Sequence, residues 1–479
     1  MRIFLIWDDK NSEITNSVLR LNEQPNKIVY WIGGQEINKN KFPETIFHND
    51  LDALRGIPAQ GVDTSEFTPP GKELIDKLHK VESLILTMMN MKLDELCTDK
   101  RKHLYYNMLQ YWCGVFKKYK LEVIIFGNIP HDTCSYLIYE LAHLLNIKTI
   151  IIEDTVVSDR LLTYNDFWAG NKDLQDELHN NQNRKFFLGD LSNDIQNYYR
   201  LQIDPSRNVA PVYIKIQKNR HSGFNLFLRK LKRLKNSIKE GTILKFLAQY
   251  IGKQFKTNLK KEYHDIQINP DFNKKFVYVP LHVQPERSTS PQGDIFVDQI
   301  LMLEILSASL PSDWIVYVKE HPSQWPRRRL SFSSARYQGY YKKLVQIKNV
   351  YLVPIETDNY ALINKSQTVA TVAGTAAWEA ILKSKPAIIF GYPWYRDCPV
   401  LFRVDDTGSC RNALQKIANG LTIDQQKILN YLKCLDNVSF HGCISPDLEQ
   451  NSTITKKESR NNIIEKIISE IKKLTINNN

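Results

Sequence analysis

Three polar segments in the second half of the chain each follow a short apolar run that predicts a β-strand. The run over 276–280 leads into His282, Gln284, Glu286 and Arg287, in a loop stiffened by two prolines. Imidazole, amide, carboxylate and guanidinium groups crowded at a strand end can hydrogen-bond a polar ligand and exchange protons with it. An ordinary polar loop is the alternative, and we favour a site that lines a sugar or a phosphate.

The second segment is Lys319-Glu320-His321-Pro322, after a predicted strand over 314–319. Lys319 and His321 can neutralise a phosphate group or donate hydrogen bonds to it, and Pro322 fixes the turn. A loop histidine without a ligand is the alternative. The position favours a functional role, because open α/β sheets bind ligands at the carboxyl ends of their strands.

The third segment joins a predicted strand over 368–372 to a helix over 376–383 through Gly374-Thr375. Glycine permits close approach of the backbone, and a helix N-terminus offers free N–H groups and a positive dipole end to a phosphate. Thr375 adds a hydroxyl, and Glu379, one turn further, can reach a ribose. The alternative is that Thr375 only caps the helix.

Strands must alternate with helices to bring these segments to one sheet edge. The other predicted strands are 2–7, 27–32, 123–126, 148–153, 350–353 and 387–390, and the other predicted helices are 74–91, 136–145 and one within 293–309. Strand, helix, strand at this spacing predicts parallel βαβ units and an α/β fold. We expect a Rossmann-like domain over 1–160, a basic helical segment over 161–274, a second Rossmann-like domain over 275–420 and terminal helices over 421–479.

The positive charge is concentrated in one segment. The 479 residues carry a formal net charge of +12, and residues 207–262 hold 15 Lys and Arg against two Asp and Glu. Phe and Leu among these cations predict amphipathic helices that either pack on the core or lie on anionic lipid.

The aromatic content of 11% excludes general disorder, and no apolar run is long enough to cross a bilayer. The amino-terminal run looks like a first strand and not a signal peptide. Seven scattered cysteines indicate reduced thiols in a cytoplasm, without a zinc site.

Together the three polar segments resemble the C-terminal half of GT-B glycosyltransferases, and more narrowly the capsule polysaccharide biosynthesis family, which includes Kdo transferases. The resemblance covers 276–402 and rests on PLHVQPERSTSPQG at 280–293, VKEHP at 318–322 and TVAGTAAWEAILKSKP at 371–386. The His-Pro pair and the later turn are also similar to bacterial sialyltransferases that use CMP-sugars. This likeness implies that His321, Pro322, Gly374 and Thr375 hold a nucleotide and its phosphate. The turn reads Ala-Gly-Thr, where those enzymes have Ser-Ser or Ser-Thr, so the choice of nucleotide stays open.

The resemblance implies a GT-B glycosyltransferase with two Rossmann-like domains facing a cleft. The expected donor is CMP-activated Kdo or a related ulosonic acid, and the expected acceptor is a surface polysaccharide or glycolipid. We expect no cofactor and no metal, because Asp50-Leu51-Asp52 does not end an apolar strand and predicts a helix start. Residues 207–262 would hold the protein on the cytoplasmic face of the inner membrane, and no nucleic-acid partner is expected.

The N-terminal half should then supply a base that removes the proton of the acceptor hydroxyl. His131 and Asp132 follow the strand over 123–126, Glu153 and Asp154 end the next strand, and Asp8-Asp9 follow the first. Asp132 or Thr133 as a simple helix cap is an equal alternative. All three pairs lie on one predicted sheet edge, so the sequence does not decide among them. We prefer them in the order in which they are named.

Two other classes of function remain. One is a different enzyme on the same scaffold, a nucleotide-sugar 2-epimerase or a glycerophosphotransferase of wall polymers. The other is a non-catalytic module that binds nucleic acid or an anionic polymer through the basic segment.

Overall fold

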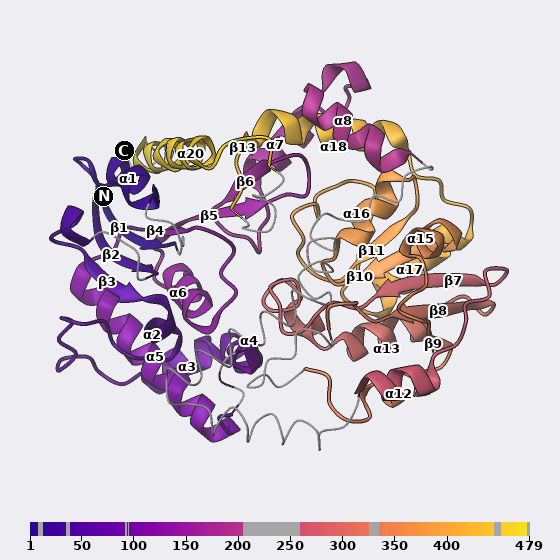
Figure 1. The fold of residues 1–479 in the computed structure, drawn as a ribbon, viewed down its shortest axis with the longest axis horizontal. Helices are drawn as coiled ribbons and strands as arrows, with labels where there is room; N and C mark the ends of the chain where they lie inside the picture. Colours follow the sequence, from indigo (N-terminus) through magenta and orange to yellow (C-terminus); the bar gives the residue numbers. More distant parts are fainter. Residues whose placement is uncertain are drawn as a thin grey trace, which may run out of the picture. The chain divides into compact units, whose positions relative to one another are not determined.

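The computed structural model describes residues 1–7, 13–34, 39–91, 93, 95–204, 259–324, 335–444 and 452–476 (Figure 1). The chain divides into two compact units. Unit 1 comprises Met1–Met89, Leu96–Ile195 and Asn430–Asn479, and unit 2 comprises Asn90–Glu95 and Gln196–Leu429. Of the predicted basic segment over 161–274, residues 205–258 lie outside the described residues, and these include all of the charge cluster 207–262 except 259–262.

The sheet of unit 1 has the strand order β13-β6-β5-β4-β1-β2-β3. The five strands β1 to β5 pair in parallel, whereas β6 and β13 pair antiparallel at one edge. The strands are β1 (Arg2–Ile6), β2 (Lys27–Gly33), β3 (Ile46–Asn49), β4 (Val123–Phe126), β5 (Lys148–Asp154), β6 (Arg160–Tyr164) and β13 (Phe440–His441). The central strands are buried on both faces, as expected of parallel strands covered by helices.

The C-terminal helix completes the core of unit 1. Helix α20 (Lys456–Ile476) packs with α1 (Glu13–Leu19), and its Ile463, Ile464 and Ile467 are buried in one cluster with side chains of β1 and β4. The terminal residues are therefore part of the first unit's core. The other helices of unit 1 are α2 (Asp50–Leu54), α3 (Lys72–Lys77), α4 (His79–Met88), α5 (Thr98–Tyr119), α6 (Thr133–Leu144) and α7 (Lys172–Asn180). Helices α8 (Asn193–Ile203) and α18 (Gln425–Val438) run from one unit into the other.

Unit 2 contains a parallel sheet with the strand order β12-β11-β10-β7-β8-β9. Read from β9, the strands run backward along the chain to β7 and then forward from β10, which is the Rossmann order 3-2-1-4-5-6. The strands are β7 (Lys275–Pro280), β8 (Trp314–Lys319), β9 (Val350–Leu352), β10 (Thr368–Thr371), β11 (Ala387–Ile389) and β12 (Leu401–Arg403).

Helices cover both faces of this sheet. Side chains of α12 (Leu259–Ile266), α13 (Gln299–Ser309), α14 (Tyr340–Gln346) and α17 (Thr407–Ala418) share one buried cluster with β7, β8 and β10. Helices α15 (Asn359–Lys365) and α16 (Thr375–Leu382) contact each other, and α16 packs on β10 and β11. Helices α13 and α17 pack against each other, and Leu303 of α13 and Leu414 of α17 are fully buried in the shared cluster.

The predicted α/β class is confirmed, with one parallel-dominated, Rossmann-like sheet in each unit. All nine predicted strands occur, and four short strands at or near sheet edges, β3, β6, β12 and β13, lacked a clear apolar run. The predicted helix over 74–91 is divided at Leu78 into α3 and α4. Asp50 does begin a helix, which Asn49 caps by accepting from the N–H groups of Leu51 and Asp52. The expectation that no strand ends before Asp50 is wrong, because the short edge strand β3 ends at Asn49. Within the described residues, none of the helices is both long and apolar enough to span a membrane. The predicted domain limits and the facing of the two domains stay predictions.

Candidate functional site

The polar residues of unit 2 gather at the carboxyl ends of β7, β8 and β10. The chain order reverses between β7 and β10, and open α/β sheets bind ligands in the crevice outside such a switch point. His282 follows β7, Glu320 and His321 follow β8, and the bend through Gly374 follows β10. The three segments predicted from the sequence therefore lie on one edge of one sheet.

His282 connects the first and third of these segments. Its Nε2 lies 2.9 Å from the Thr371 hydroxyl and 3.3 Å from the backbone nitrogen of Ala373, which donates to it. The backbone N–H of His282 donates to Gln299 Oε1 at 2.8 Å. Because Nε2 accepts from a backbone N–H, we infer that the neutral imidazole of His282 carries its proton on Nδ1. The side chain is fixed across the switch point.

Burial keeps this imidazole neutral. Desolvation lowers the pKa of His282 to about 4, with His321 and Arg336 lowering it further, while Glu286 and Glu320 oppose the shift. Only 8% of the residue is exposed. A neutral His282 can donate a hydrogen bond from Nδ1 across the physiological pH range, but it cannot serve there as a cationic partner of a phosphate.

Gly374 gives the bend after β10 its close approach to His282. It is the N-cap of α16, and a Cβ at this position would lie 2.8 Å from Thr371 Oγ1 and 2.9 Å from His282 Cε1. Its N–H donates to Thr371 Oγ1 at 3.3 Å, and the Tyr395 hydroxyl donates to its carbonyl. The N–H groups of Thr375 and Ala376 come first in α16 and are the groups that an anion would meet, whereas the N–H of Ala377 donates to the Gly374 carbonyl at 3.3 Å.

Glu379 lies one turn into α16, as predicted. Thr375 Oγ1 donates to its Oε1 at 3.4 Å, which is near the limit of a hydrogen bond. Burial raises the pKa of Glu379 to about 7, and the Thr375 hydroxyl and Lys383 only partly offset this. A carboxyl group that is half protonated near neutrality can donate as well as accept a hydrogen bond.

The segment after β8 is tied into unit 2 by its charged groups. Lys319 donates to Asn359 Oδ1 at 2.7 Å and to the carbonyl of Thr357, so its ammonium is engaged at the start of α15. The backbone N–H of His321 donates to Glu320 Oε1 at 2.7 Å. His321 Nδ1 accepts from the N–H of Ser323 at 3.1 Å, so a neutral His321 carries its proton on Nε2. The residue is half-buried, as is Pro322.

The rest of the loop after β7 has mainly a framework role. Gln284 is buried, and its side-chain amide donates to Val297 O at 2.5 Å. Its backbone N–H donates to Gln324 Oε1, and its backbone carbonyl accepts from Gln324 Nε2. The Glu286 carbonyl accepts from the N–H of Thr289 and of Ser290, which closes a turn. The side chains of Glu286 and Arg287 are half-buried at the start of that turn.

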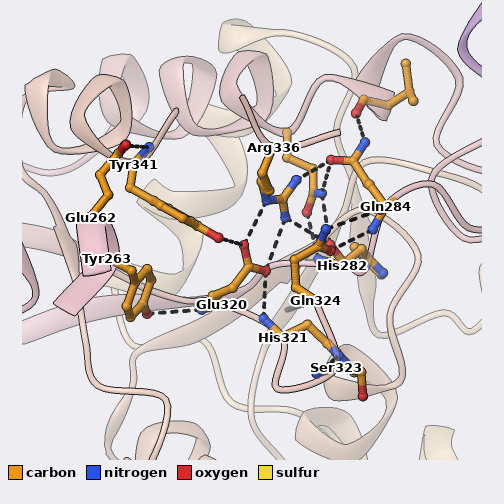
Figure 2. Close-up of polar contacts among 12 residues, drawn as sticks. Glu262, Tyr263, His282, Gln284, Glu320, His321, Ser323, Gln324, Arg336 and Tyr341 are labelled. Atoms are coloured by element: carbon orange, nitrogen blue, oxygen red, sulfur yellow. Dashed lines mark hydrogen bonds and ion pairs between the residues drawn. The ribbon is translucent and has the colours of Figure 1, made fainter. Parts of the chain in front are cut away.

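The structure also brings in Arg336, which the sequence analysis missed. Figure 2 shows its guanidinium between Glu320 and the loop that carries His282 and Gln284. It lies 16 residues beyond Glu320 and outside every strand-end segment, so spacing alone offered no signal. Thr371 and Gln299 were missed as well. Thr371 stood inside the quoted 371–386 motif, and Gln299 had no distinguishing context.

In unit 1, the predicted base candidates occupy the carboxyl ends of β4 and β5. Asp132 caps α6, and its Oδ1 accepts from the N–H of Cys134 and of Ser135, both at 2.9 Å. His131 Nδ1 lies 2.7 Å from the carbonyl of Ile129. Glu153 is buried, and Asp154 Oδ1 accepts from the N–H of Ile444 at 3.2 Å. Asp8 and Asp9 lie outside the described residues.

The predicted capping role of Asp132 is therefore present, and it leaves Oδ2 outside those two bonds. No group of His, Cys, Asp and Glu in the described parts of the chain has the arrangement of a metal site.

Two units of the Rossmann class, one with a polar cluster at its switch point, define a scaffold of the kind that binds nucleotides. Residues 216–399 match the family model of capsule polysaccharide biosynthesis proteins, and the described part of that match contains the whole cluster of unit 2. The predicted resemblance to the capsule polysaccharide biosynthesis family is thus confirmed over these residues. None of the curated proteins matches the chain.

Solved structures with some likeness include two KpsC domains of Thermosulfurimonas dismutans. The beta Kdo 2,7 transferase is 10% identical, with 74% of this chain and 89% of that chain covered and a TM-score of 0.30. The beta Kdo 2,4 transferase is 12% identical, with 65% and 87% covered and a TM-score of 0.26. UDP-GlcNAc 2-epimerase from Methanocaldococcus jannaschii is 14% identical, with 88% and 93% covered and a TM-score of 0.23. Likeness at this level does not define an activity.

Proposed function

We propose that the protein is a glycosyltransferase of capsule polysaccharide synthesis that uses a nucleotide-activated sugar. The observation that carries this is the contact of His282 with the Thr371–Gly374 bend across the β7/β10 switch point, within the family match. A switch point next to a helix N-terminus is where Rossmann-like units hold nucleotide phosphates.

In this proposal, the N-terminus of α16 and the Thr375 hydroxyl bind the donor phosphate. His321 Nε2 donates to the nucleotide, and Glu379 binds the ribose as donor or acceptor. The neutral His282 supplies an Nδ1–H beside the bend, and Glu286 and Arg287 line the sugar. No metal is required for such binding, because N–H groups and the helix dipole balance the phosphate charge, so we expect EDTA to leave turnover unchanged.

The donor that we propose is CMP-linked Kdo or a related ulosonic acid. The acceptor is a growing surface glycan or glycolipid, and Asp132 is the first choice of base, before His131, Glu153 and Asp154. Residues 207–262 would bind the anionic inner leaflet from the cytoplasm, which is testable by co-sedimentation with vesicles that contain or lack anionic lipid.

The experiment that tests the donor class is a thermal-shift screen with CMP, CDP, UDP and GDP. A ligand that binds only the folded state raises the melting temperature, because it adds about 2.7 kcal/mol to the free energy of unfolding at 100 times its Kd. We expect CMP to produce the largest rise. A rise with UDP and turnover of UDP-GlcNAc in the absence of any acceptor would favour epimerisation instead. No rise with any nucleotide would contradict the proposed function.

A further inference from the structure

The Arg336 side chain forms a buried ion pair with Glu320. Both side chains are fully buried, and Arg336 Nε lies 2.8 Å from Glu320 Oε2 while Nη2 lies 3.2 Å from Oε1. The guanidinium also lies over the ring of Tyr340, and Arg336 Cζ is 4.5 Å from the ring centroid. A charge this deep is stable only when it is paired and its remaining N–H groups find acceptors.

Two more N–H groups of Arg336 donate to the loop after β7. Nη2 donates to the carbonyl of His282 at 3.0 Å, and Nη1 donates to Gln284 Oε1. Gln284 is itself held by Gln299, whose amide donates to Gln284 Oε1 at 2.8 Å and to the His282 carbonyl at 3.3 Å. Arg336 therefore holds the backbone of the residue that contacts the Thr371–Gly374 bend.

Glu320 connects the same guanidinium to the segment after β8. Its Oε1 accepts from the N–H of His321 at 2.7 Å, and its Oε2 accepts from the Tyr341 hydroxyl at 2.6 Å. Figure 2 shows Glu320 between the Tyr341 and Arg336 side chains. One Arg–carboxylate pair thus joins the backbones of His282 and His321, which lie in the loops after β7 and β8.

We propose that Arg336 is a positioning residue of the donor site: by bonding to Glu320, to the His282 carbonyl and to Gln284, it fixes the two histidine-bearing loops relative to each other and so aligns His282 with the Thr371–Gly374 bend. This inference rests on the proposed function, because it assigns the aligned edge to the nucleotide-sugar site. A planar guanidinium suits this role, since its fixed fork bonds three acceptors at once, which an ammonium cannot reproduce in the same geometry.

The test is Arg336→Lys, which keeps the positive charge and removes the fork. We expect the Kd for the nucleotide that most stabilises the wild type to rise about tenfold by isothermal titration calorimetry. Arg160→Lys is the matched control, because Arg160 is a buried arginine of unit 1 whose Nη2 lies 3.1 Å from Asp436 Oδ1, with 6% and 9% of the two side chains exposed. Arg160→Lys should also lower the melting temperature but should keep the Kd within about twofold.

A second measurement separates positioning from mere stability. The groups whose charges act on His282 are Glu286, His321, Arg336 and Glu320, and burial is the main cause of its lowered pKa. Loosening of its loop in Arg336→Lys should admit water and move the NMR titration midpoint of His282 upward from about 4. The His282 resonance is assigned by its loss in His282→Gln, and Arg160→Lys should leave the midpoint in place.

If Arg336→Lys does not fold, the double variant Arg336→Met with Glu320→Gln removes the pair without leaving a lone buried charge. Nucleotide binding as tight as in the wild type, in either variant, would overturn the inference, as would an equal loss of affinity in Arg160→Lys. Failure of both variants to fold would reduce Arg336 to a structural role and overturn it too. If the wild-type protein binds none of the nucleotides, the proposed function itself is wrong, and the inference that rests on it is wrong too.

Discussion

The two sheets share the strand order 3-2-1-4-5, yet their polar residues at the carboxyl ends are used differently. In unit 2, His282 contacts the bend after β10, and Arg336 and Glu320 join the loops after β7 and β8. In unit 1, the bonds of Asp132 through Oδ1 stay within its own helix, and His131 Nδ1 bonds to a carbonyl two residues earlier.

Under the proposed function, this difference would separate a preformed binding edge in unit 2 from an edge in unit 1 that keeps a carboxylate oxygen for a reaction. Bonds between strands fix side chains before a ligand arrives, which reduces the ordering cost of binding. A carboxylate held on one oxygen by a helix cap keeps its second oxygen for another partner. We therefore expect changes in unit 2 to affect nucleotide affinity, and changes at Asp132 to affect the rate of transfer.

The largest expected effect comes from Asp132→Asn. Asparagine retains the helix cap, so the melting temperature and the Kd for nucleotide should stay unchanged. Loss of a general base should slow transfer by about 100-fold or more, measured as release of the nucleotide from donor and acceptor. Full turnover would move the role of base to Glu153 or Asp154.

The second-largest effect is expected from a methyl group added at the bend after β10. Gly374→Ala places a Cβ within 3 Å of Thr371 Oγ1 and His282 Cε1, so one of them must shift. We expect the nucleotide Kd to rise about 30-fold, which corresponds to about 2 kcal/mol. Gly71→Ala is the control, because Gly71 is also a helix N-cap with a similar φ of −80° and has open space around it. Equal affinities in the two variants would mean that this bend does not shape the site.

Removal of the His321 imidazole should have a smaller effect. His321→Ala deletes one proposed donor to the nucleotide, and we expect about a tenfold rise in Kd by calorimetry, with the melting temperature nearly unchanged. His79→Ala, an exposed histidine at the start of α4, should have no effect on the Kd. Unchanged binding in His321→Ala would remove this residue from the donor site.

The smallest effect concerns the pH dependence of stability. Burial raises the pKa of Glu379 to about 7, so the folded state binds more protons than the unfolded state between pH 4.5 and 7, and stability falls as pH rises through this window. His282 has the opposite effect: its pKa is lowered to about 4, so its contribution is present above pH 6.5 and is lost as pH falls toward 4. Glu379→Gln should therefore stabilise the protein at pH 8 by roughly 1 kcal/mol and change little at pH 5, measured as melting temperatures. Stabilisation at pH 5 that equals the gain at pH 8 would contradict this assignment.

Much of the fold followed from short-range patterns. The apolar runs before His282, Lys319 and Gly374 are central parallel strands, which are buried on both faces and therefore read as continuous hydrophobic segments. Strands β6 and β13 lie at a sheet edge, where burial demands less of the sequence, and they carried no comparable signal. The packing of α20 on β5 and α1 was beyond prediction for another reason, because it joins residues more than 300 positions apart.

The amino-acid sequence by itself determined which polar residues stand at strand ends, because strands buried on both faces read as continuous apolar runs and the polar residues begin where those runs stop. Only the tertiary structure decided which of those residues meet. Strand order placed β7 between β8 and β10, which brought His282 beside Thr371 and next to Glu320. It also supplied Arg336, whose role depends on a buried carboxylate and a backbone carbonyl from two different loops. Such contacts arise from packing over long sequence separations, which local patterns do not encode.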